Sequence, residues 1–185
     1  MIIIVSGPSG VGKGTVVKEI GKRLSDLKIG ITCTTRKPRV GEKNGVDYYF
    51  VSEEEFEKLV SENRLAEHSL VHGNHYGTPM DEIEQGLHDM DIVFQIDVQG
   101  AKKIKNLYND ALLIFLMPPS LDSLLLRLNG RGTETAEERD RRIKRAQEEM
   151  EERIYYDYIV TNDNLEKAVN EIIDIIKSER LNRGA

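Results

Sequence analysis

A glycine-rich loop with a single lysine lies near the start of the chain, where residues Gly7 to Thr15 form the sequence GPSGVGKGT. The spacing G-x-x-x-x-G-K is typical of loops that bind phosphate, although Gly14 stands where Ser or Thr is usual. Glycines allow backbone N–H groups to approach a ligand closely, and Lys13 adds a positive charge. A helix expected over Thr15–Leu24 would direct its N-terminal N–H groups and dipole at an anion. The loop therefore predicts a site for a nucleotide triphosphate, with a plain turn between strand and helix as the alternative.

A second group of residues suited to phosphate lies in the basic, turn-rich segment TTRKPRVGEKNGVDYYF. Arg36, Lys37 and Arg39 cluster there, and arginine side chains bind phosphate oxygens bidentately. The two tyrosines near its end supply neutral hydroxyl donors. The alternative is a basic loop that is simply solvated. Beside a phosphate-binding loop, however, a second phosphate site indicates two phosphorylated substrates, as in a kinase that acts on a nucleotide.

These residues must be positioned by an alternation of strands and helices. Strands that are apolar throughout are typical of parallel sheets covered by helices on both faces, so the expected fold class is α/β with three layers. Ligands bind such sheets at the carboxyl ends of the strands, where the glycine-rich loop, Asp97 and the pair Asn162-Asp163 lie. The apolar runs expected to form the sheet include Met1–Val5, Ile29–Cys33, Asp91–Val98, Leu112–Met117 and Tyr158–Thr161.

The segments between these runs contain clear helix and turn signals. Ser52 and Glu55 have the spacing of a capping box and predict the start of a helix. The segment 66–78 predicts two strands that turn at Gly73-Asn74. A long, mostly charged helix is expected from about Thr135 to Arg153, with few apolar residues to anchor it. Further helices are expected at about 79–88, 102–108, 121–128 and 166–180.

Length, charge and cysteine content narrow the class of protein. The 185 residues fit one domain, and the net charge of −6 does not favour binding to nucleic acid or an anionic membrane. The single cysteine, Cys33, is typical of a reducing compartment. No apolar run approaches the ~20 residues of a membrane span, and the four histidines are scattered without a cluster for zinc. We therefore expect a cytoplasmic protein with neither a membrane nor a nucleic-acid partner.

Several further motifs occur in one order along the chain: TTRKPRVGEKNGVDYYFVS, GNHYGT, IDVQG, GRGTET and VTND. Together with the glycine-rich loop, they resemble the guanylate kinase family from Ile3 to about Ile176. The resemblance implies a P-loop NTPase fold with a central parallel sheet in a single domain over residues 1–185. Its core would comprise residues 1–31, 82–125 and 156–185. A GMP-binding subdomain would span about 32–81 and a mobile helical lid about 126–155.

The resemblance also implies roles in GMP binding. Glu42 would order the arginines of the basic segment. A carboxylate such as Glu67 can accept from the adjacent N1–H and N2–H donors of guanine, and a hydroxyl such as that of Thr78 can donate to O6. Adenine reverses this pattern and would leave buried groups unpaired. The residues implied for the GMP phosphate are Arg36, Arg39, Tyr48 and Tyr76, and those for guanine are Thr32, Glu67, Thr78 and Asp97.

For the other substrate, the resemblance implies in-line transfer of the γ-phosphoryl group of Mg-ATP to GMP, with dGMP as a further candidate acceptor and no obligate protein partner. Positioning and charge neutralisation dominate such reactions. Lys13, Arg39, Arg131 and Arg142 would be catalytic, the last two from the lid. Arg127 and Asn162 would lie near adenine. The ATP-binding loop itself would consist of Gly7, Pro8, Ser9, Gly10, Val11, Gly12, Lys13, Gly14 and Thr15.

The sequence departs from the family pattern at three positions. Gly14 replaces a hydroxyl residue that usually binds Mg²⁺, and Gln95 replaces a residue that is often acidic. Thr161 stands where Val is common, which is a minor change. Mg²⁺ is therefore expected to be held mainly through ATP phosphates and water, with Thr15 and Asp97 as the candidate protein ligands.

Three other functions are compatible with parts of the pattern. Guanylate-kinase-like domains also serve as catalytically silent binding modules, but these usually lack an intact phosphate-binding loop. A related kinase could act on a different phosphorylated acceptor. A simple P-loop ATPase would leave the second anion site unexplained.

Overall fold

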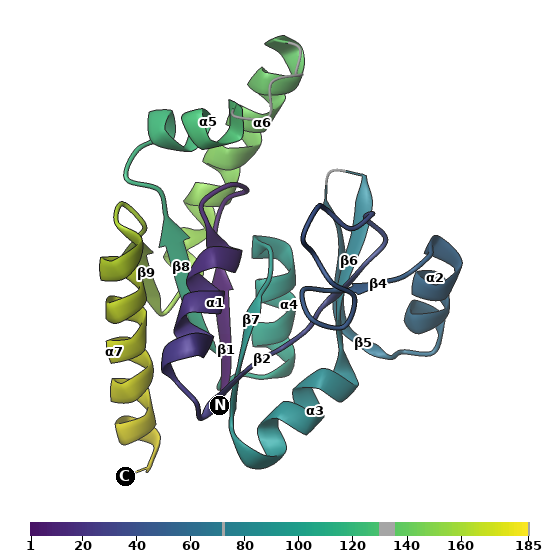
Figure 1. The fold of residues 1–185 in the computed structure, drawn as a ribbon, viewed down its shortest axis with the longest axis vertical. Coiled ribbons are helices and arrows are strands. Elements are labelled where there is room, and N and C mark those ends of the chain that lie inside the picture. Colours follow the sequence, from purple (N-terminus) through teal and green to yellow (C-terminus); the bar gives the residue numbers. More distant parts are fainter. Residues whose placement is uncertain (72, 130–135, 185) are drawn as a thin grey trace. The chain divides into compact units, whose positions relative to one another are not determined.

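The computed structural model describes residues 1–71, 73–129 and 136–184, and their side chains except at 88, 89, 128, 129, 136–140 and 142. The central sheet has five strands in the order β2-β7-β1-β8-β9. Strand β2 pairs in parallel with β7, and β8 pairs in parallel with β9. This arrangement confirms the expected α/β fold class (Figure 1). The strands are β1 (Ile2–Ser6), β2 (Leu27–Ile29), β7 (Asp91–Gln95), β8 (Leu112–Met117) and β9 (Tyr158–Thr161).

The apolar strands are buried because helices cover the sheet. All five residues of β1 are buried, as expected for a parallel strand with both faces covered. Helix α1 (Lys13–Arg23) packs against α7 (Leu165–Gly184). Helix α7 buries Ala168, Val169, Ile172, Ile173 and Ile176, which recur at helical spacing.

A second, four-stranded sheet has the order β4-β3-β6-β5. Strand β5 (Leu65–Val71) pairs antiparallel with β6 (Asn74–Pro79), which confirms the hairpin expected at 66–78, although Asn74 pairs with Val71 and belongs to β6 rather than to the turn. The capping box is also confirmed, because Ser52 and Glu55 exchange side-chain and backbone hydrogen bonds at the start of α2 (Glu53–Ser61). The sheet is completed by β3 (Cys33–Thr34) and β4 (Tyr49–Phe50).

The strand expected over Ile29–Cys33 is wrong, since the chain changes sheet within it. Residue 30 ends the pairing in the central sheet: its N–H donates to Val93 at 2.9 Å, and a Cβ at Gly30 would lie 2.1 Å from the Phe94 ring. Cys33 then pairs with Gly77 in the second sheet. Close packing of glycine on an aromatic ring is a tertiary contact that the apolar run does not encode.

The strand expected over Asp91–Val98 is shorter than predicted. It ends at Gln95 because Asp97 caps α4 (Val98–Leu107), which begins four residues earlier than expected. Helix α3 (Met80–Asp89) follows β6 closely, as expected. The side chain of Asp97 therefore lies at the junction between a central strand and a helix.

The chain forms two compact units, one of residues 1–4 and 26–112 and one of residues 5–25 and 113–185. The second unit also contains α5 (Leu121–Asn129), α6 (Ala136–Glu151) and a 3-10 helix, η1 (Glu152–Tyr155). Helix α6 agrees with the long charged helix expected from about Thr135. Among the described residues, no helix has the length and apolar character needed to cross a membrane.

Candidate active site

Two glycines of the glycine-rich loop are required by its geometry. Gly7 has a φ of +142°, and a Cβ there would lie 2.3 Å from the carbonyl oxygen of Leu116. Gly12 has a φ of +103°, and a Cβ there would lie 2.7 Å from Nδ2 of Asn162. Both positions combine positive φ with close approach, so any side chain would disrupt the loop.

The loop presents backbone donors at the start of α1. The hydrogen bond from the Val16 N–H to the Gly12 carbonyl, at 3.1 Å, is the first of the helix. The N–H groups of Gly14 and Thr15 therefore precede the helical ladder, at the positive end of the helix dipole. This arrangement is suited to a phosphate group.

The ammonium group of Lys13 lies across the loop. Its Nζ donates to the carbonyl oxygens of Gly7 at 2.6 Å and Pro8 at 3.1 Å. Carbonyl oxygens carry only partial charge, so anionic phosphate oxygens can replace them as partners of the ammonium group. The predicted lysine and the predicted loop thus form one cationic site.

The side chains of Arg127 and Asn162 hold the backbone of the glycine-rich loop. Both donate to the carbonyl oxygen of Val11, Asn162 through Nδ2 at 2.8 Å and Arg127 through Nη1 at 3.3 Å. Arg127 also donates to the backbone oxygen of Asn162 at 3.1 Å. These two residues, expected near adenine, therefore fix the backbone of the phosphate-binding loop.

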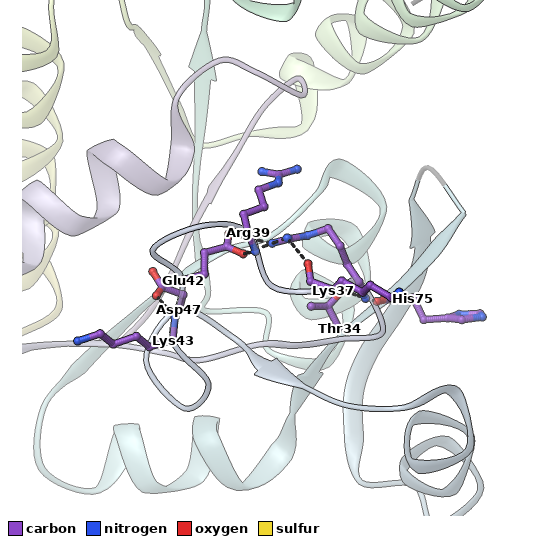
Figure 2. A network of polar contacts seen from close by, with 8 residues as sticks. Thr34, Lys37, Arg39, Glu42, Lys43, Asp47 and His75 are labelled. Carbon is purple, nitrogen blue, oxygen red and sulfur yellow. Dashed lines mark hydrogen bonds and ion pairs between the residues drawn. The ribbon is translucent and has the colours of Figure 1, made fainter. Parts of the chain in front are cut away.

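In the other unit, Glu42 organises the basic segment. Its carboxylate accepts two hydrogen bonds from the Arg36 guanidinium, at 2.9 and 3.0 Å, and one from the Arg39 backbone N–H at 2.7 Å. Partial burial acts to raise the pKa of Glu42, but Arg36 and the Arg39 N–H hold that pKa below its usual range. Figure 2 shows the guanidinium of Arg39 extending away from this network. The ordering role predicted for Glu42 matches this geometry.

Aromatic rings surround the Arg36 guanidinium. Its carbon lies 5.3 Å from the centroid of the Tyr48 ring and 5.7 Å from that of Phe50, within range of cation–π attraction. The Tyr48 and Tyr76 rings are 6.1 Å apart. The structure therefore brings together Arg36, Tyr48 and Tyr76, three of the residues predicted to hold the GMP phosphate. The neighbouring Tyr49 instead donates its hydroxyl to Glu82 at 2.7 Å.

Glu67 is a buried carboxylate with one oxygen held and one oxygen without a partner. It lies opposite Thr78 in the β5–β6 pair, and the Thr78 hydroxyl donates to Oε1 at 2.7 Å. Oε2 is buried and has no hydrogen-bond partner among the described residues. Burial raises the pKa of Glu67 to about 7, and the charge of Asp97 acts in the same direction. An unpartnered buried carboxylate oxygen is costly, so this atom marks a position for a ligand donor.

Asp97 accepts hydrogen bonds from two segments, strand β5 and the start of α4. Its Oδ1 accepts from the N–H groups of Gln99 and Gly100, at 2.8 and 3.1 Å, and its Oδ2 accepts from the Ser69 hydroxyl. Thr32 is also buried in this unit. The predicted guanine-binding residues Glu67, Thr78 and Asp97 are thus linked through β5, β6 and the start of α4.

Two residues beside Glu67 and Asp97, Ser69 and Gly100, were not predicted from the sequence. Ser69 lies two positions after Glu67 in β5, and residues two apart share one face of a strand, so this spacing was an available signal. A Cβ at Gly100 would lie 2.6 Å from Oε2 of Glu67. Glycine is therefore required at position 100 to make room for the carboxylate.

The structure does not describe the side chains of the two arginines that were expected in a lid. Arg131 falls in the gap between the described ranges, and Arg142 lies in α6 without a described side chain. For the metal, the described residues contain no group of three or more His, Cys, Asp or Glu side chains arranged to hold an ion. Thr15 is exposed and Gln95 is half-buried.

A cationic glycine-rich loop after the first strand, and a separate site that combines arginine, tyrosine and a buried carboxylate, define a P-loop nucleotide kinase. The chain belongs to the guanylate kinase family, whose profile matches residues 1–179.

Individual guanylate kinases are similar to this chain over nearly its whole length. It is 46% identical to a guanylate kinase of Bacillus subtilis, with 99% of this chain and 91% of the relative covered. It is 43% identical to one of Prochlorococcus marinus, with 96% and 97% covered. The crystal structure of guanylate kinase from Anaplasma phagocytophilum superposes with a TM-score of 0.79 at 32% identity, covering 97% of this chain and 85% of that one. The chain is therefore a phosphotransferase that uses ATP to convert GMP to GDP.

Proposed function

We propose that Glu67, with its unpartnered oxygen, is the group that selects guanine in this reaction. Guanine presents N1–H and N2–H side by side, and a carboxylate can accept from both. Thr78 supports the carboxylate by donating to Oε1. Thr32 and Asp97 complete the base site, with Ser69 orienting Asp97. Adenine lacks the paired donors, so it would leave Oε2 of Glu67 buried and unpaired.

The phosphate of GMP binds to Arg36, Arg39, Tyr48 and Tyr76. The support for this assignment is that Glu42 holds Arg36 by two hydrogen bonds, so a planar donor group is fixed before the substrate arrives. Glu42 accepts a hydrogen bond from the backbone N–H of Arg39, and the exposed side chain of Arg39 can reach the acceptor phosphate.

ATP binds to the loop from Gly7 to Thr15, with its phosphates on the N–H groups at the start of α1. Lys13 exchanges its carbonyl partners for phosphate oxygens and follows the transferring group. Arg127 and Asn162 support the loop by donating hydrogen bonds to the carbonyl oxygen of Val11. Arg131 and Arg142 neutralise charge in the transition state together with Arg39. The segment of about 126–155 closes as a lid over ATP, and the segment of about 32–81 forms the GMP-binding subdomain.

The residues present fit Mg²⁺ as part of Mg-ATP rather than as an ion in a protein cage. Asp97 already accepts from Ser69, Gln99 and Gly100, and Thr15 offers one hydroxyl at the helix start. Mg²⁺ typically keeps several waters and one or two protein ligands at such sites. When bound, it neutralises charge on the β- and γ-phosphates. The substrates are ATP and GMP, with dGMP as a further acceptor, and the reaction takes place in the cytoplasm.

The exchange of Lys13 for Ala tests the proposed ATP site. We expect turnover to fall by about a thousandfold or more, because a positioned cation in the transition state is lost, while the fold remains intact by circular dichroism. Lys18→Ala, on the exposed side of the same helix, is the matched control. Turnover by the Lys13→Ala variant at the wild-type rate would contradict the proposed site.

A further inference from the structure

One carboxylate of helix α6 contacts the phosphate-binding loop at the turn from Pro8 to Val11, which we call the rim of the loop. Oε2 of Glu149 accepts a hydrogen bond from the backbone N–H of Ser9 at 3.2 Å. Oε1 of the same side chain accepts from Nε of Arg145 at 3.3 Å. The Glu149 side chain is only 13% exposed, so these contacts are largely shielded from water. Both partners lie in the same compact unit as Glu149.

The Glu149 carboxylate binds at the rim of the loop and not at the start of α1. The Val11 N–H donates to the Pro8 carbonyl at 3.2 Å, which closes a turn that contains Ser9. The donors suited to phosphate, at Gly14 and Thr15, belong to the other end of the loop. Glu149 therefore holds the loop by a separate N–H group and leaves the helix N-terminus to ATP.

The negative charge of Glu149 would repel ATP if it were unpaired. The ion pair with Arg145, four residues earlier on the same helix, offsets that charge locally. Ala146, three residues before Glu149, is buried. Residues three and four apart lie on one face of a helix, so the second half of α6 packs through this face.

The same helix carries Arg142, one of the expected lid arginines, about two helical turns before Glu149. A helix is a stiff element, so fixing its second half limits where its first half can lie. A contact between Glu149 and Ser9 therefore links the position of the loop to the position of the lid.

We propose that Glu149 is a positioning residue for ATP, which holds the rim of the phosphate-binding loop against α6 so that the loop and the lid helix move together. This inference deepens the proposed function and rests on its assignment of the ATP site. Glu149 itself acts through the Ser9 backbone and α6, not by contact with the reacting atoms.

Three variants test the role of Glu149. In Glu149→Ala, we expect the KM for ATP and the Kd for ADP to rise by about tenfold, the low end for loss of a hydrogen bond to a charged group. The KM for GMP should stay within about twofold. Glu149→Gln keeps an acceptor oxygen for Ser9 and should restore most of the ATP affinity. Glu148→Ala removes the same charge from an exposed neighbour on α6 and is the control.

Two results would overturn the proposal. If Glu149→Ala lowered only the melting temperature and left the KM for ATP unchanged, the contact would be merely structural. If Glu149→Ala tightened ATP binding, the carboxylate would compete with phosphate instead of positioning the loop. Failure of the proposed function is recognised separately, because Lys13→Ala would then retain wild-type turnover whatever Glu149 does.

Discussion

Exchange of Glu67 for Gln separates the binding role of this buried carboxylate from its cost to stability. The Gln carbonyl oxygen can still accept from Thr78, but an amide NH₂ replaces the oxygen that lacks a partner among the described residues. The guanine donors would then face a donor. Losing hydrogen bonds to a charged group costs about 2 kcal/mol, so we expect the KM for GMP to rise by about 30-fold.

The same exchange changes how stability depends on pH. Burial raises the pKa of Glu67 from 4.5 to about 7 in the folded protein. A raised carboxyl pKa stabilises the fold at low pH, where both states keep the proton, and this contribution is lost as pH rises from 4.5 through about 7, the range in which the folded state still holds a proton that the unfolded state has released. Between pH 5 and pH 8, the wild-type protein should therefore lose on the order of 2–3 kcal/mol of unfolding free energy that the Glu67→Gln variant keeps.

Urea unfolding of both proteins without nucleotide, at the two pH values, measures this difference. Steady-state kinetics at pH 8 measure the KM for GMP and for ATP. Glu62→Gln, an exposed position at the end of α2, controls for loss of a surface charge. A KM for GMP within about twofold of wild type in the variant would contradict the binding role of Glu67. An equal difference in stability between the two proteins at both pH values would contradict its raised pKa.

Two further predictions concern the GMP site. A Cβ at Gly100 would lie 2.4 Å from Ile96 and 2.6 Å from the Glu67 carboxylate, so Gly100→Ala should raise the KM for GMP by about tenfold. Gly184→Ala, where a Cβ meets nothing within 4 Å, is its control, and equal kinetics in the two variants would contradict the packing argument. Glu42→Gln removes the charge that holds Arg36 and should raise the KM for GMP by about fivefold with the ATP KM unchanged. A weakening that falls on ATP instead would show that Glu42 does not serve the GMP site.

Local patterns in the sequence predicted the elements that depend on local physics. The glycine-rich loop, the capping box at Ser52 and the hairpin at Gly73-Asn74 all rest on residues close together in the chain. The register of that hairpin places Glu67 directly opposite Thr78. The alternation of apolar strands and helices predicted the α/β fold class, but it did not predict the order of the strands in the central sheet.

Tertiary contacts account for what the sequence alone did not predict. Gly30 ends β2 because it packs on the Phe94 ring, a contact across the fold. Gly100 lies beside Glu67 in the proposed guanine site because the start of α4 packs against β5. Tyr49 and Tyr48 are adjacent and chemically alike, yet Tyr49 donates to the buried Glu82. Tyr48 instead lies against the Arg36 guanidinium and the Tyr76 ring, so the roles of these two tyrosines are set by their tertiary contacts.

The role of Glu67 in selecting GMP is tested most simply by measuring ADP release from Mg-ATP in the presence of GMP, AMP, CMP, UMP or no acceptor, for the wild-type protein and for Glu67→Gln. We predict that the wild type releases ADP rapidly with GMP and with no other acceptor, and that the variant shows a weaker preference for GMP. Equal release with AMP and GMP by the wild-type protein would contradict the assignment of Glu67 as the residue that selects guanine.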